Sequence, residues 1–119
     1  MVVISDTSAI TNLQQIGQLD LLRQIFGTIL IPSAVQQELS VIAEQRSMLA
    51  KLSWIQVMSP QNQQLIQILG KELDWGESEA IALAIEKKAD FLIIDEFAGR
   101  QIAQKYGIPV VGILGVLVQ

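Results

Sequence analysis

The pattern of hydrophobic and polar positions divides the chain into short apolar runs and longer amphipathic segments. The apolar runs are typical of strands buried on both faces of a sheet, and they lie at residues 2–4, 28–31, 54–57, 91–94 and 108–113. The segments between them repeat apolar residues at the three- and four-residue spacings of amphipathic helices, and they lie at residues 9–16, 19–26, 33–52, 60–70, 77–88 and 98–106. Because the two kinds alternate, we expect an α/β fold, a single three-layer α/β/α domain over residues 1–119 with a mostly parallel sheet of about five strands.

Local signals at the ends of these segments agree with this division. Ser33 followed by Gln36 is a capping-box pattern, so we expect a helix over residues 33–52. The inner face of the glutamine-rich helix 60–70 is expected to carry Leu65, Ile68 and Leu69. The final run, 114–118, is apolar almost to the last residue, so we expect either that the chain continues or that a partner covers this run.

Composition narrows the chemistry that the chain can perform. It contains no cysteine and no histidine, which excludes disulfides, thiol nucleophiles, zinc fingers and histidine acid–base catalysis. Its net charge of −4 argues against a basic surface for nucleic acid, although carboxylates around divalent cations present a positive face to phosphate. No apolar run approaches the length of a membrane span and no export leader precedes the first strand, so we expect a cytoplasmic location and no membrane.

Four of the twelve acidic residues occupy positions where a charge is unusual. Asp6 and Asp95 each follow a buried apolar strand at its carboxyl end, where open α/β sheets bind ligands. Glu38 and Glu77 lie on helix stripes that otherwise carry apolar residues. Acidic residues are almost never fully buried unless they pair with a cation or coordinate an ion. We therefore expect the four carboxylates to cluster at the carboxyl edge of the sheet.

The residues alone leave two interpretations of these acids open: ordinary structural roles, or a site for a divalent cation. Asp6 or Ser8 could simply cap the following helix, and Arg100, about one turn past Asp95, could neutralise one or two acids. Local cations are too few for all four, and two unit charges about 4 Å apart repel by roughly 4 kcal/mol at an effective dielectric near 20. A bound divalent cation relieves that repulsion, and ligands that are all oxygen select Mg²⁺ or Mn²⁺ over zinc.

The segments around the four acids resemble a PIN domain. More narrowly, the chain is similar to the bacterial PIN-like group related to VapC-like toxin ribonucleases. The matching segments are Asp6-Thr7-Ser8, Pro32 with Val35 and Glu38, the stretch from Gly76 to Ala84, and Leu92-Ile93-Ile94-Asp95. The resemblance covers essentially the whole chain and implies a Mg²⁺- or Mn²⁺-dependent ribonuclease that cuts single-stranded RNA, its acids holding one or two ions.

The resemblance also implies a role for each acid. By position, Asp6, Glu38 and Asp95 match the first, second and fourth metal-binding and catalytic acids of the family. Glu77 matches the third, while Glu79 is the alternative third ligand or an outer ligand.

Three further residues are supporting candidates. Ser8 matches the hydroxyl residue that supports the first acid of the family, and Asn12 and Arg100 are candidate helpers that contact the substrate or the carboxylates. Asn12 and Arg100 each have an alternative as an ordinary residue on a helix surface.

Relatives commonly form homodimers, and those that are toxins have an antitoxin protein as partner. Members of the narrower group continue for several helices past residues 112–115, so the resemblance implies that this chain is truncated at its C-terminus or completed by a second copy.

The main rival hypothesis is a PIN-shaped module that binds nucleic acid or protein without cutting. A phosphatase that forms an aspartyl-phosphate usually has an Asp-x-Asp motif after its first strand. This alternative is disfavoured because Asp6-Thr7-Ser8 has a serine where that motif has its second aspartate.

Overall fold

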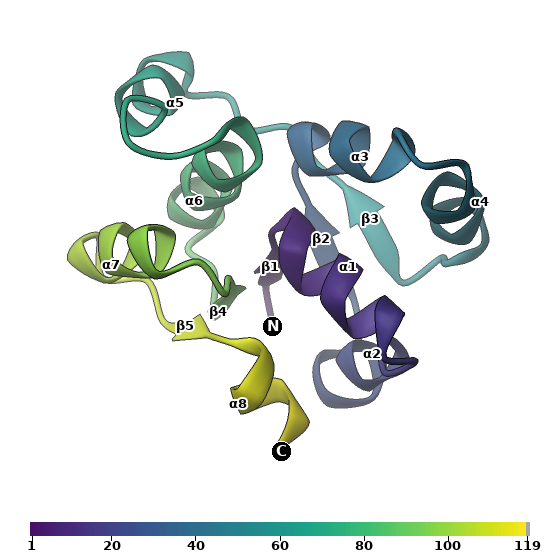
Figure 1. Cartoon of the computed structure of the whole chain (residues 1–119). Helices are drawn as coiled ribbons and strands as arrows, with labels where there is room; N and C mark the ends of the chain where they lie inside the picture. The colour runs from purple at the N-terminus through teal and green to yellow at the C-terminus, as the bar shows by residue number, and fades with distance from the viewer. Residues whose placement is uncertain (119) are drawn as a thin grey trace.

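The computed structural model describes residues 1–118, which fold around a parallel sheet. Within these residues the sheet has five strands in the order β3-β2-β1-β4-β5 (Figure 1). The strands are β1 (Val3–Ser5), β2 (Ile29–Ile31), β3 (Ile55–Val57), β4 (Phe91–Ile93) and β5 (Val110–Val111). The expected α/β architecture with a parallel sheet is therefore confirmed.

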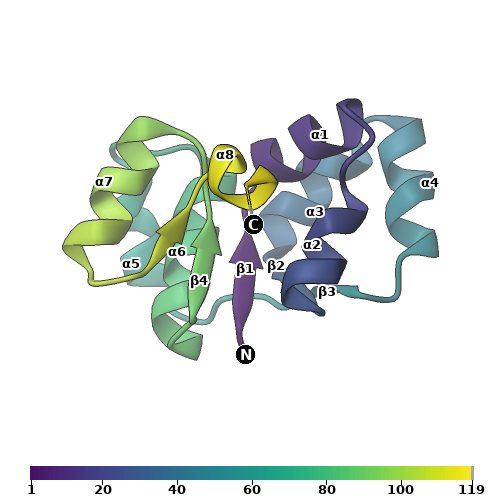
Figure 2. The same ribbon diagram turned by 90° about the horizontal axis from the view of Figure 1, so that it is seen from below.

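Helices cover both faces of this sheet. In the described part of the chain they are α1 (Thr7–Gln15), α2 (Asp20–Phe26), α3 (Ser33–Ser40), α4 (Ala43–Lys51), α5 (Gln63–Leu69), α6 (Trp75–Lys87), α7 (Phe97–Lys105) and α8 (Ile113–Leu117). Figure 2 shows α5, α6 and α7 on one side of β1 and β4, with α1 to α4 on the other side. The arrangement is the three-layer one that the alternating pattern predicts.

The strands supply two separate cores because successive strand residues point to opposite faces of a sheet. Val3 and Ile93 pack with residues of α1, α2, α3 and α8. Ile4 and Leu92 pack with residues of α5, α6 and α7. All four side chains are fully buried, as continuous apolar runs in a parallel sheet require.

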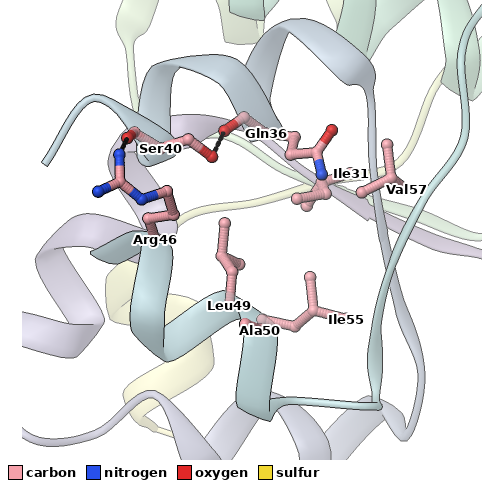
Figure 3. Close-up of a pocket in the computed structure, with 8 residues that line it drawn as sticks. All are labelled: Ile31, Gln36, Ser40, Arg46, Leu49, Ala50, Ile55 and Val57. Carbon is pink, nitrogen blue, oxygen red and sulfur yellow. Dashed lines mark hydrogen bonds between the residues drawn. The ribbon is translucent and has the colours of Figure 1, made fainter. Parts of the chain in front are cut away.

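The single helix expected over residues 33–52 is wrong, because α3 and α4 are separated by a break at Val41 and Ile42. Ile42 has extended backbone angles (φ −96°, ψ 124°), and both side chains are exposed instead of lying on the inner stripe. Ser40 Oγ donates to a backbone carbonyl one turn earlier at 2.7 Å, and Arg46 Nη1 donates to Ser40 O at 3.1 Å (Figure 3). Two adjacent β-branched residues weaken a helix, and these polar contacts hold the chain in the turn that replaces it.

The turn between α3 and α4 leaves a cavity of about 210 Å³ beside β2 and the edge strand β3 (Figure 3). Its apolar lining residues are Ile31, Leu49, Ala50, Ile55 and Val57. No acidic residue lines this cavity, so it is separate from the candidate acids.

Helix α5 also differs from expectation. It begins after Asn62, whose Oδ1 caps it by accepting a hydrogen bond from Leu65 N at 3.0 Å, and not at Pro60. Its inner face carries Leu69 and the half-buried Leu65, as expected, together with Ile66, whereas Ile68 is 57% exposed. Residues two apart in a helix lie on nearly opposite sides, so burial of Ile66 turns Ile68 outward.

The C-terminal apolar run is partly covered by the chain itself. The strand expected over residues 108–113 is limited to β5, and the chain turns at Gly112 into α8. Val116 of α8 is buried in the core shared with α1, α2 and α3, whereas Val118 is 79% exposed. Among the described helices, none has the length and apolar character needed to cross a membrane.

Ile81 and Ile68 allow a direct test of this packing, because the first is fully buried in α6 and the second is exposed on α5. Ile81→Ala should lower the free energy of unfolding by about 2–5 kcal/mol, since it removes buried hydrocarbon and leaves a cavity. Ile68→Ala should change it by less than about 0.5 kcal/mol. Urea unfolding followed by circular dichroism measures both values, and equal losses would contradict the assigned inner and outer faces.

Candidate functional site

The candidate acids lie at the carboxyl edge of the sheet, where its topology reverses. The chain proceeds from β1 to β2 and β3 on one side, and β4 and β5 are added on the other, so the crevice beside β1 and β4 is the expected ligand position. Asp6 directly follows β1, and Asp95 follows β4 after Ile94. Asp6 N donates to Ile93 O at 3.1 Å, which ties the two strand ends together.

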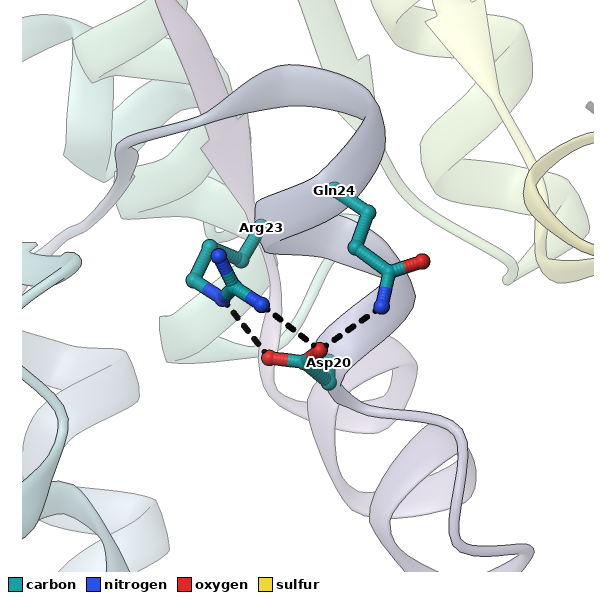
Figure 4. Close-up of polar contacts among 3 residues, drawn as sticks. All are labelled: Asp20, Arg23 and Gln24. Atoms are coloured by element: carbon teal, nitrogen blue, oxygen red, sulfur yellow. Dashed lines mark hydrogen bonds and ion pairs between the residues drawn. The ribbon is translucent and has the colours of Figure 1, made fainter.

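Asp6 is buried but only half satisfied. The residue is 1% exposed, and its Oδ1 caps α1 by accepting a hydrogen bond from Ala9 N at 3.0 Å. Its Oδ2 is the one buried side-chain oxygen or nitrogen in the described part of the chain that has no hydrogen-bond partner. The exposed Asp20 differs, because Arg23 and Gln24 bind both of its carboxylate oxygens (Figure 4). Asp6 therefore caps a helix with one carboxylate oxygen and keeps the other buried without a hydrogen-bond partner.

Burial also makes Asp6 hard to ionise. The pKa of Asp6 is raised from the usual 3.8 to about 7, chiefly by burial, and the hydrogen bond from Ala9 N partly offsets this rise. The charges of Glu77, Asp74 and Asp95 contribute to the same rise. Asp6 is thus surrounded by like charge from the starts of α6 and α7.

Arg100 does not relieve this repulsion. The only ion pair among the described residues joins Arg23 to Asp20 on α2. The possibility that Arg100 neutralises one or two of the acids is not realised among the described residues, because no carboxylate there lies within ion-pair distance of its guanidinium.

Glu38 lies against the first turns of α1 and α6. Thr7 Oγ1 donates to Glu38 Oε1 at 2.9 Å. A Cβ atom at Gly76 would collide with Glu38 Oε1, so the glycine leaves the space that this carboxylate occupies. Burial raises the pKa of Glu38, the Thr7 hydrogen bond lowers it, and the charge of Asp74 raises it.

Glu77 is held by the first turn of its own helix. Glu77 N donates to Asp74 Oδ1 at 2.8 Å and Asp74 N donates to Glu77 Oε1 at 3.2 Å, which is a reciprocal capping box. Its Oε2 reaches α7, where a Cβ at Gly99 would lie 3.2 Å away. Burial raises the pKa of Glu77, the Asp74 backbone hydrogen bond lowers it, and the charges of Asp74 and Glu96 raise it.

Asp95 is the most exposed of the four acids. Its Oδ1 accepts a hydrogen bond from Ile113 N, the first residue of α8, at 3.1 Å. A Cβ at Gly112 would lie 3.2 Å from the same oxygen and would collide with the Arg100 guanidinium. Asp95 and Arg100 thus lie on either side of a glycine that leaves room for both.

Glu79 faces a different element from Glu77. Its Oε1 accepts hydrogen bonds from Ser33 Oγ at 3.0 Å and from Ala34 N at 2.8 Å, both at the start of α3. Pro32, which precedes α3, makes no side-chain cap, so Glu79 supplies this cap from α6. The placement favours Glu77 as the third acid and gives Glu79 a structural role.

The remaining expected residues lie on α1. Ser8 is half-buried and Asn12 is exposed, and within residues 1–118 neither side chain makes a hydrogen bond. The hydroxyl that contacts a site acid is that of Thr7, which the sequence did not single out. Asp74 was also missed, although the Asp-x-x-Glu spacing of Asp74 and Glu77 is a recognisable capping-box signal.

The acids share an edge but do not form a preassembled metal site. Within the described residues no three acidic side chains converge closely enough to hold one ion, so the expected four-carboxylate cluster is not present. Two physical causes separate them. Glu38, Glu77 and Asp95 each bind a donor on a different helix, and like charges repel in a half-buried setting.

The donor chemistry nevertheless fits a hard divalent cation. Asp6 Oδ2 is buried without a partner among the described residues, and a bound cation is one group that would satisfy it. The neighbouring acids that raise the pKa of Asp6 include Glu77 and Asp95, and all of these donors are oxygens. Such a set suits Mg²⁺ or Mn²⁺.

Comparisons with known proteins agree with this fold. A family model described as a PIN domain matches residues 2–119. The fold is also similar to a solved PilT N-terminus domain protein from the hyperthermophilic archaeon Sulfolobus solfataricus P2, with a TM-score of 0.71 and 20% identity over 99% of this chain and 92% of that one. At this identity the likeness concerns the fold alone. A comparison with curated proteins gave no match.

The raised pKa of Asp6 predicts how stability depends on pH without divalent cations. Because the folded pKa of about 7 exceeds the usual 3.8, Asp6 favours the folded state below pH 4 and loses that contribution as the pH rises through 7. Asn keeps an oxygen that can cap α1 but carries no charge. Asp6→Asn should therefore be more stable than the wild type at pH 8, by on the order of 4 kcal/mol at most, with the difference shrinking toward pH 4. Urea unfolding with a chelator at several pH values measures this, and a less stable variant at pH 8 would contradict it.

Glu79 offers a second test. Glu79→Ala should lower the free energy of unfolding by about 1–3 kcal/mol, because the buried Ala34 N–H loses its acceptor. Glu72→Ala is the control, since Glu72 is exposed between α5 and α6 and should change stability by less than about 0.5 kcal/mol. An unchanged unfolding curve for Glu79→Ala would remove the structural role and reopen the choice between Glu77 and Glu79.

Proposed function

The chain belongs to the PIN-domain family, whose members are generally nucleases that use divalent metal ions, and on that premise we propose that it is a metal-dependent ribonuclease. The reaction is hydrolysis of phosphodiester bonds in single-stranded RNA, with Mg²⁺ or Mn²⁺ as cofactor. One observation carries the proposal: the buried Asp6 Oδ2 has no hydrogen-bond partner among residues 1–118 and faces the acids of neighbouring elements.

The residues that would hold the ion are Asp6, Glu77 and Asp95, with Glu38 completing the group from α3. Asp6 is the central ligand because its oxygen is free. Thr7 orients Glu38 through the hydroxyl hydrogen bond. Glu77 has one oxygen in its capping box, which leaves Oε2 as the atom for the ion.

The chemistry that a divalent ion supplies when bound is activation of water near neutral pH and neutralisation of charge on the phosphate. The chain itself has no cysteine or histidine to serve as a nucleophile or proton carrier. Its carboxylates would hold the ion at fixed places along one edge, and only with the ion bound would that edge attract and orient a phosphodiester. No residue becomes covalently attached to the substrate in this mechanism.

The proposal also includes a role as the toxin of a toxin–antitoxin pair and assembly as a homodimer. The resemblance to toxin ribonucleases supports a cytoplasmic toxin with an antitoxin protein as partner. A homodimer is supported by the apolar Val118, which is 79% exposed near the end of the described chain.

A second candidate is a PIN-shaped module that binds nucleic acid or protein without cutting. The observation that favours it is the separation of the acids, since no three of them in the described part converge on one point.

Metal binding and cleavage decide between the two candidates. In a thermal-unfolding titration, Mn²⁺ or Mg²⁺ at 100 times its dissociation constant should stabilise the wild type by about 2.7 kcal/mol. Asp6→Asn and Asp95→Asn should lose this response and at least about 100-fold of RNA cleavage, since even losing a group that only supports a metal ligand costs 10–100-fold. Asp20→Asn is the matched control, because Asp20 is an exposed acid bound to Arg23 and Gln24.

The outcomes separate clearly. Metal stabilisation and cleavage that both depend on Asp6 support the nuclease. RNA binding without cleavage in the wild type supports the binding module. Cleavage by Asp6→Asn at the wild-type rate would show that the mechanism is wrong.

A further inference from the structure

We propose that a cavity beside the acids binds one nucleotide of single-stranded RNA, with its phosphate on Arg100. The inference rests on the proposed function, because it assigns a substrate subsite to the same edge of the sheet. The cavity has a volume of about 490 Å³ and lies between α7, β5 and the start of α8. Its size falls within the range of about 300–1,000 Å³ that small-molecule sites occupy.

The guanidinium of Arg100 is available to a ligand. The residue is half-buried on α7 and lines the cavity, and among residues 1–118 its side chain has no hydrogen-bond or ion-pair partner. Five N–H donors in a fixed planar arrangement match the oxygens of a phosphate. An arginine left without a protein acceptor in a cavity is therefore suited to an anion from outside.

The fold keeps space for this side chain. A Cβ at Gly112 would collide with the Arg100 guanidinium, so any other residue at this position would displace it. Gly112 has φ −92° and ψ 176°, which every residue type adopts easily. Its lack of a side chain is thus explained by the space that Arg100 needs and not by backbone conformation.

The rest of the lining divides by chemistry. Asp95, one of the candidate metal ligands, lies on the same cavity as Arg100. Val110, Val111 and Leu114 supply an apolar surface, and Leu114 is 78% exposed. A nucleotide matches this division, because its phosphate pairs with the guanidinium while its ribose and base cover apolar side chains. The next phosphodiester of the strand then lies beside Asp95 and the other acids.

The test is binding of a fluorescein-labelled oligouridylate of about eight nucleotides, followed by fluorescence anisotropy with a chelator, so that cutting does not occur. The titration is repeated with Mg²⁺ in the Asp6→Asn background. Arg100→Gln should weaken binding about tenfold, as expected for a charge-assisted contact. It should also reduce the slope of log affinity against log salt by about 0.7, the value for one phosphate contact on a single strand.

Two further variants make the test specific. Gly112→Ala should weaken binding to a similar extent, because the added methyl group displaces the guanidinium while the backbone keeps its angles. Lys105→Gln is the matched control, since it removes the same charge from the exposed end of α7, outside this cavity. It should leave both the affinity and the salt slope unchanged.

Several results would overturn the inference. These are equal effects of Arg100→Gln and Lys105→Gln, wild-type binding by Gly112→Ala, or no binding of the oligomer either by the wild type with chelator or by Asp6→Asn with Mg²⁺. The cleavage assay keeps this outcome separate from that of the proposed function. Cleavage that survives Arg100→Gln with unchanged binding removes the subsite but keeps the nuclease. Binding that depends on Arg100 without any cleavage removes the nuclease but keeps the subsite.

Discussion

The hydrogen bonds between acidic side chains and the backbone N–H groups of helix N-termini are the interactions on which this edge of the molecule depends. In a parallel sheet covered by helices, each strand ends where a helix begins, so unpaired N–H donors collect at the carboxyl edge. Asp6 binds such a donor on α1, Glu79 on α3, Asp74 on α6 and Asp95 on α8. These donors allow several acids to lie at one edge, although none of them has an ion-pair partner among the described residues.

Asp6 differs from the other acids at this edge in how its carboxylate is hydrogen-bonded. One of its oxygens caps α1, but the other is buried without a partner in the described part of the chain. The cost of burial and the charges of nearby acids together raise its pKa to about 7. Burial opposes the ionisation of Asp6 in the absence of a cation, and a cation bound at this oxygen would favour the ionised form.

Three glycines control how the other acids are arranged. Gly76 leaves room for Glu38, Gly99 for Glu77, and Gly112 for both Asp95 and Arg100. Each glycine belongs to a different element from the carboxylate beside it, so the spaces exist only when the helices are packed. The acids are therefore brought to one edge while each remains in its own niche, which explains why they are close enough to influence one another without converging.

The sequence by itself determined the order of strands and helices and the parallel sheet, because both depend on local periodicity. It also determined that Asp6 and Asp95 follow buried strands, since strand ends are visible as the ends of apolar runs. It favoured Glu77 over Glu79 as the third acid, but it could not show what Glu79 does, because only the packing of α3 against α6 reveals that Glu79 caps α3. The break at Val41 and Ile42 was missed for a related reason, because helical periodicity continues through a turn that tertiary contacts impose.

Contacts between distant segments, such as Thr7 with Glu38 and Gly112 with Arg100, were decided only by the tertiary structure. They join residues about 31 and 12 positions apart, and no local pattern records which side chains a fold brings together.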